Sequence, residues 1–164
     1  MTQKEVFLQD LVAEGQRTRK ILERVPFDKA AWKPHEKSMS LGALSQHLTN
    51  LPRWTGMTIL HDELDFAKPL ELTKPAESTA ELLTRFDARL SEALRDLQSI
   101  DASALDEPWT MRHGEQVFFT RPKREVLREF VLSHMIHHRG QLSVYLRLLD
   151  VPVPSIYGPT ADER

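Results

Sequence analysis

Three histidines in two helical segments are the residues of this chain best suited to bind a metal ion. His134 and His138 are four residues apart in an uninterrupted helical pattern, and His47 lies in an earlier helical segment. Residues i and i+4 project from one side of a helix about one turn apart, so two imidazoles can bind one ion. A third imidazole would complete a three-nitrogen site with open coordination positions, as in catalytic zinc-type sites. The pattern therefore predicts a metal site formed by His47, His134 and His138.

Another histidine, His137, is an alternative ligand. The apolar pattern of the last helical segment fits two stripes, one containing His134 with His138 and the other containing His134 with His137. The i, i+4 spacing favours His138, as in the two-histidine helix motif of metalloproteases, although that motif's glutamate is missing here. His61 lies 14 residues beyond His47, about 21 Å along an ideal helix, which is too far to share the ion.

The competing interpretation is that these histidines are hydrogen-bonded core residues. Burying three imidazoles without partners is costly, and one cation satisfies all three neutral nitrogens, so the metal interpretation is favoured. Gln141 and Tyr145 follow His138 by one and two turns, and they could contact a metal-bound water or substrate, or pack in the core. His35 and His113 fall in predicted loops, where surface positions are the default.

The composition is that of a soluble globular protein, and the 164 residues form one predicted domain, 1–164. A net charge of -2 gives no general attraction to nucleic acid or to an anionic membrane. The chain has no cysteine, so thiolate ligands and an internal thiol nucleophile are excluded. No stretch approaches the roughly 20 apolar residues that span a bilayer, and no signal peptide is recognisable, so we expect a cytoplasmic location.

Four long helical patterns must position the histidines. They are expected at about Thr2–Val25, from the Ser40 N-cap to about Leu64 with a kink at Pro52, Thr79–Ser99 behind a Ser78–Glu81 capping box, and Pro122–Leu149. Amphipathic helices of this length predict an all-α protein, a four-helix bundle. Residues 101–122 are expected to form an irregular connection or a short hairpin, and the proline-rich tail after Leu149 to lie extended.

Three segments resemble the DinB family, which is grouped with the YfiT-like metalloenzymes. They are Ser38-Met-Ser-Leu-Gly-Ala-Leu-Ser-Gln-His47-Leu, His134-x-x-His-His138-Arg-Gly-Gln-Leu, and Val153-Pro-Ser-Ile-Tyr-Gly-Pro-Thr-Ala-Asp162. The resemblance covers nearly the whole chain. It implies a DinB-like four-helix bundle in which His47, His134 and His138 hold one divalent ion, nickel or zinc, and it resolves the His137 alternative by analogy. It also implies a homodimer and relatives that are thiol-dependent transferases and isomerases using bacillithiol, mycothiol or glutathione.

Two functions follow as hypotheses. The first is a metal-dependent enzyme acting on a small molecule, most readily a thiol S-transferase whose thiol comes from a low-molecular-weight cosubstrate, with a metal-dependent hydrolase as a variant. The second is a non-catalytic metal-binding or stress-response protein, in which a fourth protein group closes the shell, with His137, Gln141 or a nearby carboxylate as the candidates. A homodimer is also expected because the second helix carries extra large apolar residues, namely Trp54, Met57, Ile59 and Leu60.

Overall fold

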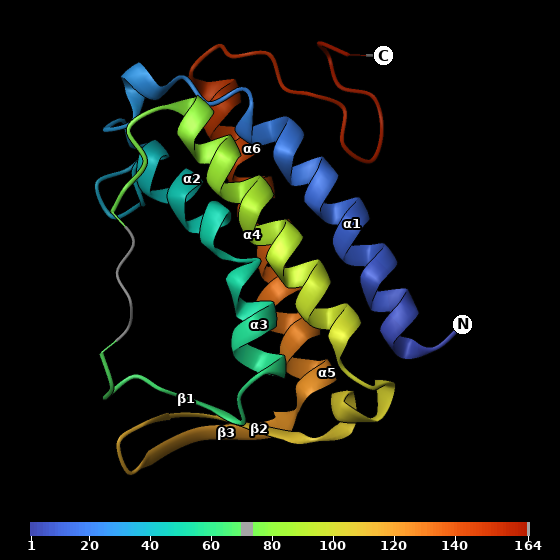
Figure 1. Cartoon of the computed structure of the whole chain (residues 1–164). Helices are drawn as coiled ribbons and strands as arrows, with labels where there is room; N and C mark the ends of the chain where they lie inside the picture. The colour runs from blue at the N-terminus through green and yellow to red at the C-terminus, as the bar shows by residue number, and fades with distance from the viewer. Residues whose placement is uncertain (70–73, 164) are drawn as a thin grey trace.

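The computed structural model describes residues 1–69 and 74–163, and four helical rods run side by side through them (Figure 1). The first rod is α1 (Gln3–Leu22) and the third is α4 (Thr79–Ser99). The second consists of α2 (Leu41–Asn50) followed by α3 (Arg53–Ile59). The fourth consists of α5 (Lys123–Val126), the π-helical segment η3 (Leu127–Ser133) and α6 (His134–Leu148). Two short 3₁₀ turns complete the helical elements: η1 (Phe27–Lys29) and η2 (Ala102–Asp106).

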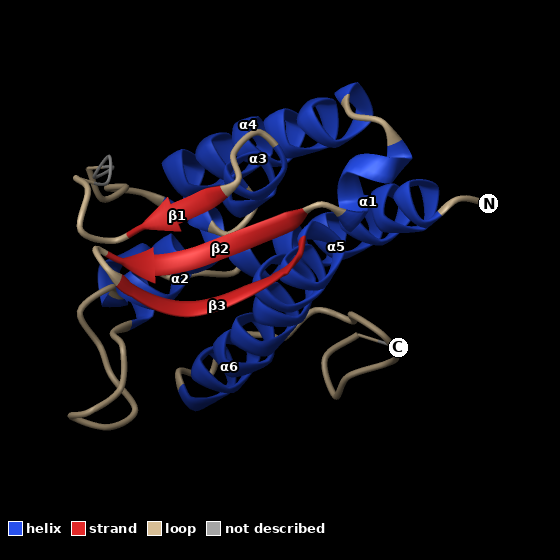
Figure 2. Ribbon diagram, turned by 90° about the horizontal axis from the view of Figure 1, so that it is seen from below, coloured by secondary structure: helices blue, strands red, loops and turns tan. Residues whose placement is uncertain are grey.

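The prediction of an all-α bundle is wrong, because a three-stranded mixed sheet crosses one end of the rods (Figures 1 and 2). β2 (Pro108–His113) and β3 (Gln116–Pro122) form an antiparallel hairpin, and β1 (Glu63–Asp65) pairs parallel to β2. The second helix was expected to reach Leu64, but α3 ends at Ile59. The next residues pair with the hairpin instead, and helical spacing over so few residues could not reveal that long-range partner.

The hairpin turns at Gly114, which has φ +58°, a left-handed conformation that glycine adopts without steric cost. Asp65 holds this turn because its Oδ1 accepts a hydrogen bond from the Gly114 N–H at 2.8 Å. On the inner side of the sheet, Leu64, Trp109 and Met111 are buried with Val126 of α5 in a second, smaller core. The sheet therefore attaches to the rods through apolar packing as well as through backbone pairing.

The main core lies between the rods, where their apolar stripes meet. Its side chains include Leu11 and Ile21 of α1, Leu44 and Leu48 of α2, Leu82 and Phe86 of α4, and Leu142 and Leu146 of α6. Helix starts follow the cap residues expected from the sequence. The Thr2, Ser40 and Ser78 side chains accept hydrogen bonds from the third backbone N–H after each cap. The reciprocal half of the Ser78 capping box is absent, since Glu81 accepts from Glu77 N–H instead.

The fourth rod is not the uninterrupted α-helix that the apolar pattern predicted. Across η3 the hydrogen bonds shift, so the His134 backbone N–H bonds to the Glu129 carbonyl five residues back. A π segment is wider than an α-helix, and it turns the following residues to a different phase. Met135, Arg139, Leu142 and Leu146 consequently face the core. His134 and His138 lie half-buried at the edge of that buried face rather than along its centre.

The π segment also places Phe130 between the sheet and the second rod. Its ring stacks on Trp54 of α3 at 5.8 Å and on Phe119 of β3 at 5.4 Å between centroids. Trp54 and Met57 pack against the smaller core, and Ile59 is only 5% exposed, whereas Leu60 is 54% exposed. Of the four residues that motivated the homodimer, one is buried and two are partly covered within this chain, and the homodimer stays a prediction.

The C-terminal tail runs over α1 and α6 (Figure 1). Asp162 accepts a hydrogen bond from the Val153 N–H at 2.9 Å and pairs with Arg147 of α6. Glu163 pairs with Arg24 at 2.7 Å. Among the described residues, no helix is long and apolar enough to cross a membrane.

Candidate metal centre

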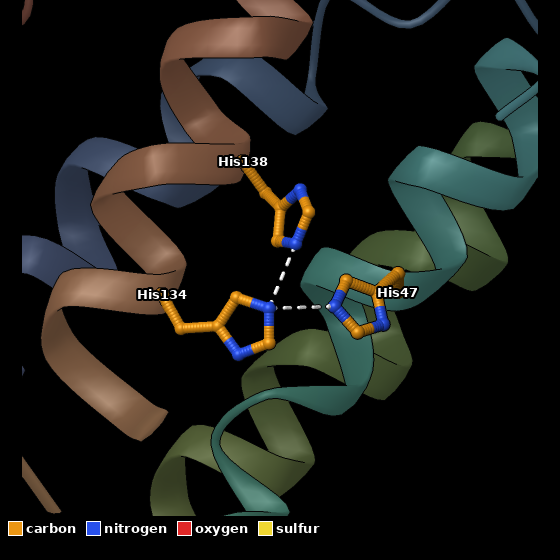
Figure 3. A group of neighbouring side chains, drawn as sticks. All are labelled: His47, His134 and His138. Carbon is orange, nitrogen blue, oxygen red and sulfur yellow. Dashed lines mark hydrogen bonds between the residues drawn. The ribbon is translucent and has the colours of Figure 1, made fainter. Parts of the chain in front are cut away.

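The three predicted histidines meet between α2 and α6, as Figure 3 shows. His47 lies in the last turn of α2, His134 opens α6, and His138 follows one turn later. The Nε2 atom of His134 is 3.2 Å from Nε2 of His47 and 2.8 Å from Nε2 of His138. One nitrogen from each ring, with the three within 4.8 Å of one another, forms a group that could hold a metal ion.

The donor set fits a divalent transition metal. Zn–N bonds of about 2.0–2.1 Å in a tetrahedral shell place nitrogen ligands about 3.3 Å apart. The His47–His134 separation of 3.2 Å is close to that value, and the His134–His138 separation of 2.8 Å is somewhat shorter. Without an ion, a single proton on His134 Nε2 could satisfy only one of its two contacts, whereas a cation would satisfy all three nitrogens. Among the described residues, no cysteine or carboxylate joins the group.

The surroundings keep the three imidazoles neutral, which is the form that binds a metal. The pKa of His47 is lowered to about 4, mainly by burial and also by the charges that His138 and His134 would carry. Burial is also the main cause of the lowered pKa of His134 and His138. A hydrogen bond to the Phe130 backbone opposes this effect at His134, and the hydrogen bond with Gln141 opposes it at His138.

We expect the metal-free protein to lose stability as the pH falls from about 6.5 towards 4. In this window the unfolded chain protonates its histidines near their ordinary pKa of about 6.5, while folded His47, with a pKa of about 4, resists protonation. Well above pH 6.5 both states are neutral and the effect vanishes. The loss from His47 is no more than about 3 kcal/mol. Urea unfolding at pH 7 and 5 measures it, and His47→Gln should flatten this pH dependence; an unchanged slope would contradict the assignment.

The remaining candidate residues lie elsewhere or make other contacts. His137 is exposed and packs edge-on against His138 at 4.9 Å, outside the three-nitrogen group. Gln141 contacts one of the three histidines from outside the group: its Oε1 is 2.7 Å from Nδ1 of His138. Tyr145 does not reach the histidines, because its hydroxyl donates to the Met39 carbonyl and its ring packs on Trp32. His35, His61 and His113 are exposed and away from the group.

A groove of about 640 Å³ lies against α2 and has His47 on its wall. Its apolar lining comes from α2, from the segment before α2 and from the segment before α4. It includes Phe27, Met39, Ala43 and Ala76. Gln46 closes one wall, because its Oε1 accepts a hydrogen bond from the Ala76 N–H at 2.9 Å. This groove was not predicted from the sequence. A signal was present in Ala43 and Gln46, which follow helical spacing on the side of α2 away from the core.

The fold and the site define a helix-rich protein with a half-buried three-histidine group of the kind that binds divalent metals. A family model for the DinB family matches residues 1–164, and the chain belongs to this family. The resemblance inferred from the sequence motifs is thus confirmed.

Individual relatives agree with this assignment. The uncharacterised protein YrdA of Bacillus subtilis (strain 168) is 26% identical over 161 residues, which cover 96% of this chain and 89% of that protein. The crystal structure of a DinB-like protein, YjoA, from Bacillus subtilis superposes with a TM-score of 0.70 at 20% identity and covers 96% of this chain and 99% of its own. A DinB-like protein from Bacillus cereus ATCC 10987 gives a TM-score of 0.73 at 20% identity, with 93% and 97% covered. At these identities the two structures support the fold alone.

Proposed function

We propose that this protein is a metal-dependent enzyme in which His47, His134 and His138 bind one nickel or zinc ion. The observation that carries the proposal is the convergence of three neutral imidazole nitrogens without a fourth metal-binding side chain among the described residues. Three protein ligands leave room for an exchangeable group, which is typical of catalytic sites. Gln141, one candidate for a fourth ligand, is engaged with His138.

The reaction we favour is transfer of a low-molecular-weight thiol to a small electrophile. A bound divalent ion would supply Lewis acidity that lowers the pKa of a thiol or water. The chain has no cysteine, so the attacking sulfur has to come from a cosubstrate such as bacillithiol, mycothiol or glutathione. In the reaction the sulfur bonds to the electrophilic carbon, the leaving group departs with its electron pair, and the thiol proton passes to solvent.

The chain's own residues supply binding and orientation. The groove beside His47 offers apolar walls next to one of the three histidines. The Gln46–Ala76 hydrogen bond holds one of these walls against α2. This arrangement favours small substrates with an apolar portion over charged polymers.

Thiol-transfer assays on metal-free and reloaded protein test this function. Protein reloaded with zinc or nickel should conjugate at least one of the three thiols to a chloronitrobenzene electrophile faster than background, and chelator should remove that rate. The His61→Ala protein, altered at an exposed histidine outside the group, serves as the matched control and should keep the rate. A protein that turns over none of the thiols, and whose melting temperature falls strongly on chelation, would instead have a structural ion.

A further inference from the structure

Gln141 makes a contact that bears directly on how His138 presents its nitrogen. The Gln141 Oε1 lies 2.7 Å from Nδ1 of His138, and the two residues are three positions apart on α6. Side chains at i and i+3 meet on one helix face, so the contact is built into the helix itself. A carbonyl oxygen accepts but cannot donate, so this contact is a hydrogen bond when Nδ1 of His138 carries the ring proton.

The consequence concerns the opposite side of the ring. A neutral imidazole has one N–H, so a proton fixed on Nδ1 leaves Nε2 with its lone pair free. This Nε2 is the atom that faces Nε2 of His134 at 2.8 Å. Metal-bound histidines are generally held by such a partner on their other nitrogen, which fixes both the tautomer and the ring orientation.

His134 also has a hydrogen-bond partner within the fourth rod, but this partner is a backbone group and not a side chain. In an α-helix the Phe130 carbonyl would accept the His134 backbone N–H, but in η3 that N–H bonds to Glu129 and Val131 instead. The ring of His134 hydrogen-bonds to the Phe130 backbone. His134 and His138 thus each have a hydrogen-bond acceptor from their own helical rod.

Contacts with α1 also fix the rotation of α6, which carries Gln141, about its own axis. Arg139, next to His138, is only 2% exposed, and its guanidinium bonds to the Glu14 carboxylate at 2.6 Å and to Thr18 Oγ1 at 3.2 Å. These contacts with α1 fix the face of α6 that turns towards α2. Gln141 therefore acts on a ring whose backbone is already in place.

We propose that Gln141 is a positioning residue that holds His138 in the Nδ1–H tautomer, with Nε2 directed at His134 and His47. The role in metal binding rests on the proposed function, whereas the tautomer is a property of the protein without any ion. Gln141 is exposed, so its replacement removes no core packing. A change in the His138 tautomer would therefore reflect the lost contact and not a loss of structure.

Nitrogen-15 NMR of the histidine rings in the metal-free protein tests the tautomer. At a pH where the rings are neutral, wild-type His138 should be in the Nδ1–H form, and Gln141→Ala should shift it to a mixture of the two tautomers. Gln141→Glu keeps an acceptor at the same position and should restore the Nδ1–H form. Ser143→Ala is the matched control, since Ser143 lies on the same helix and bonds only to the Gly140 carbonyl.

Zinc affinity, measured by competition with a chromophoric chelator, provides the second readout. Gln141→Ala should weaken binding about 10- to 100-fold, as loss of a histidine's outer partner typically does, while Gln141→Glu and Ser143→Ala should stay near wild type. An unchanged His138 tautomer in Gln141→Ala would overturn the proposal, whatever the zinc affinity. Wild-type protein that fails to bind zinc would overturn the proposed metal site, but it would leave the tautomer result standing.

Discussion

Replacing His134 with alanine is expected to abolish binding of the divalent ion. His134 is the central member of the group, because its Nε2 contacts the Nε2 atoms of both His47 and His138. Its loss would leave two nitrogens on different helices, with no carboxylate among the described residues to replace it. Affinity should fall by more than about 100-fold, since changes to outer partners alone cost about 10- to 100-fold. Metal analysis of the purified protein and calorimetric titration of the metal-free protein measure the loss.

Two other histidines provide controls for this experiment. His61→Ala should bind the ion as the wild type does, because His61 is exposed and outside the group. His137→Ala is the more demanding control, since His137 adjoins His138 and was the alternative ligand from the sequence. Full metal occupancy in His134→Ala, or loss of binding in His137→Ala, would show that the ligand set is assigned incorrectly.

Replacing Arg139 with methionine is expected to lower the free energy of unfolding by about 3–5 kcal/mol, the typical cost of removing one partner from a buried ion pair. Burial raises the pKa of Glu14, but hydrogen bonds from Tyr157 and Arg139 outweigh it and keep the pKa below its ordinary value. Without Arg139, a carboxylate that is only 9% exposed would lose its main counter-charge. Urea unfolding at pH 7 measures the difference.

Arg147→Met is the matched control for this loss. Arg147 lies two turns further along α6 and pairs with Asp162 near the surface, with 49% of its side chain exposed. Such pairs contribute about 0–1 kcal/mol. The double variant Arg139→Met with Glu14→Gln removes both charges and should recover part of the stability. Equal losses for Arg139→Met and Arg147→Met would mean that the buried network does not stabilise the fold.

Local signals in the sequence predicted the helices well. The third predicted helix, Thr79–Ser99, coincides with α4, because Ser78 supplies a cap and the stripe behind it is regular. The second helix was predicted too long, since nothing near residues 60–64 indicates their pairing with a hairpin more than 40 residues away. Strand pairing is a long-range property, and three residues such as Glu63–Asp65 carry too little pattern to reveal it.

The candidate site could be predicted from the sequence because it, too, depends on local helical spacing. The i, i+4 spacing of His134 and His138 and the helical placement of His47 predicted residues that the structure brings together. The role of Gln141 was not predicted, because a side chain that orients a ligand and one that contacts a substrate have the same spacing. The π segment was also missed, since no local residue preference distinguishes Leu127–Ser133 from an α-helix. Metal binding itself stays a prediction.

The π segment has a consequence for the tolerance of this protein to insertions and deletions. A π turn is what a one-residue insertion leaves in an α-helix, so deleting one residue within 127–133 would restore α-helical register. The residues on either side of the segment would keep nearly the same phase, because the wider π turn already absorbs the extra residue. A one-residue deletion within α6 itself, by contrast, would rotate every later residue by about 100° relative to the earlier part of the helix. A change in chain length by one residue is therefore accommodated more easily in this turn than in the α-helical parts of the fourth rod.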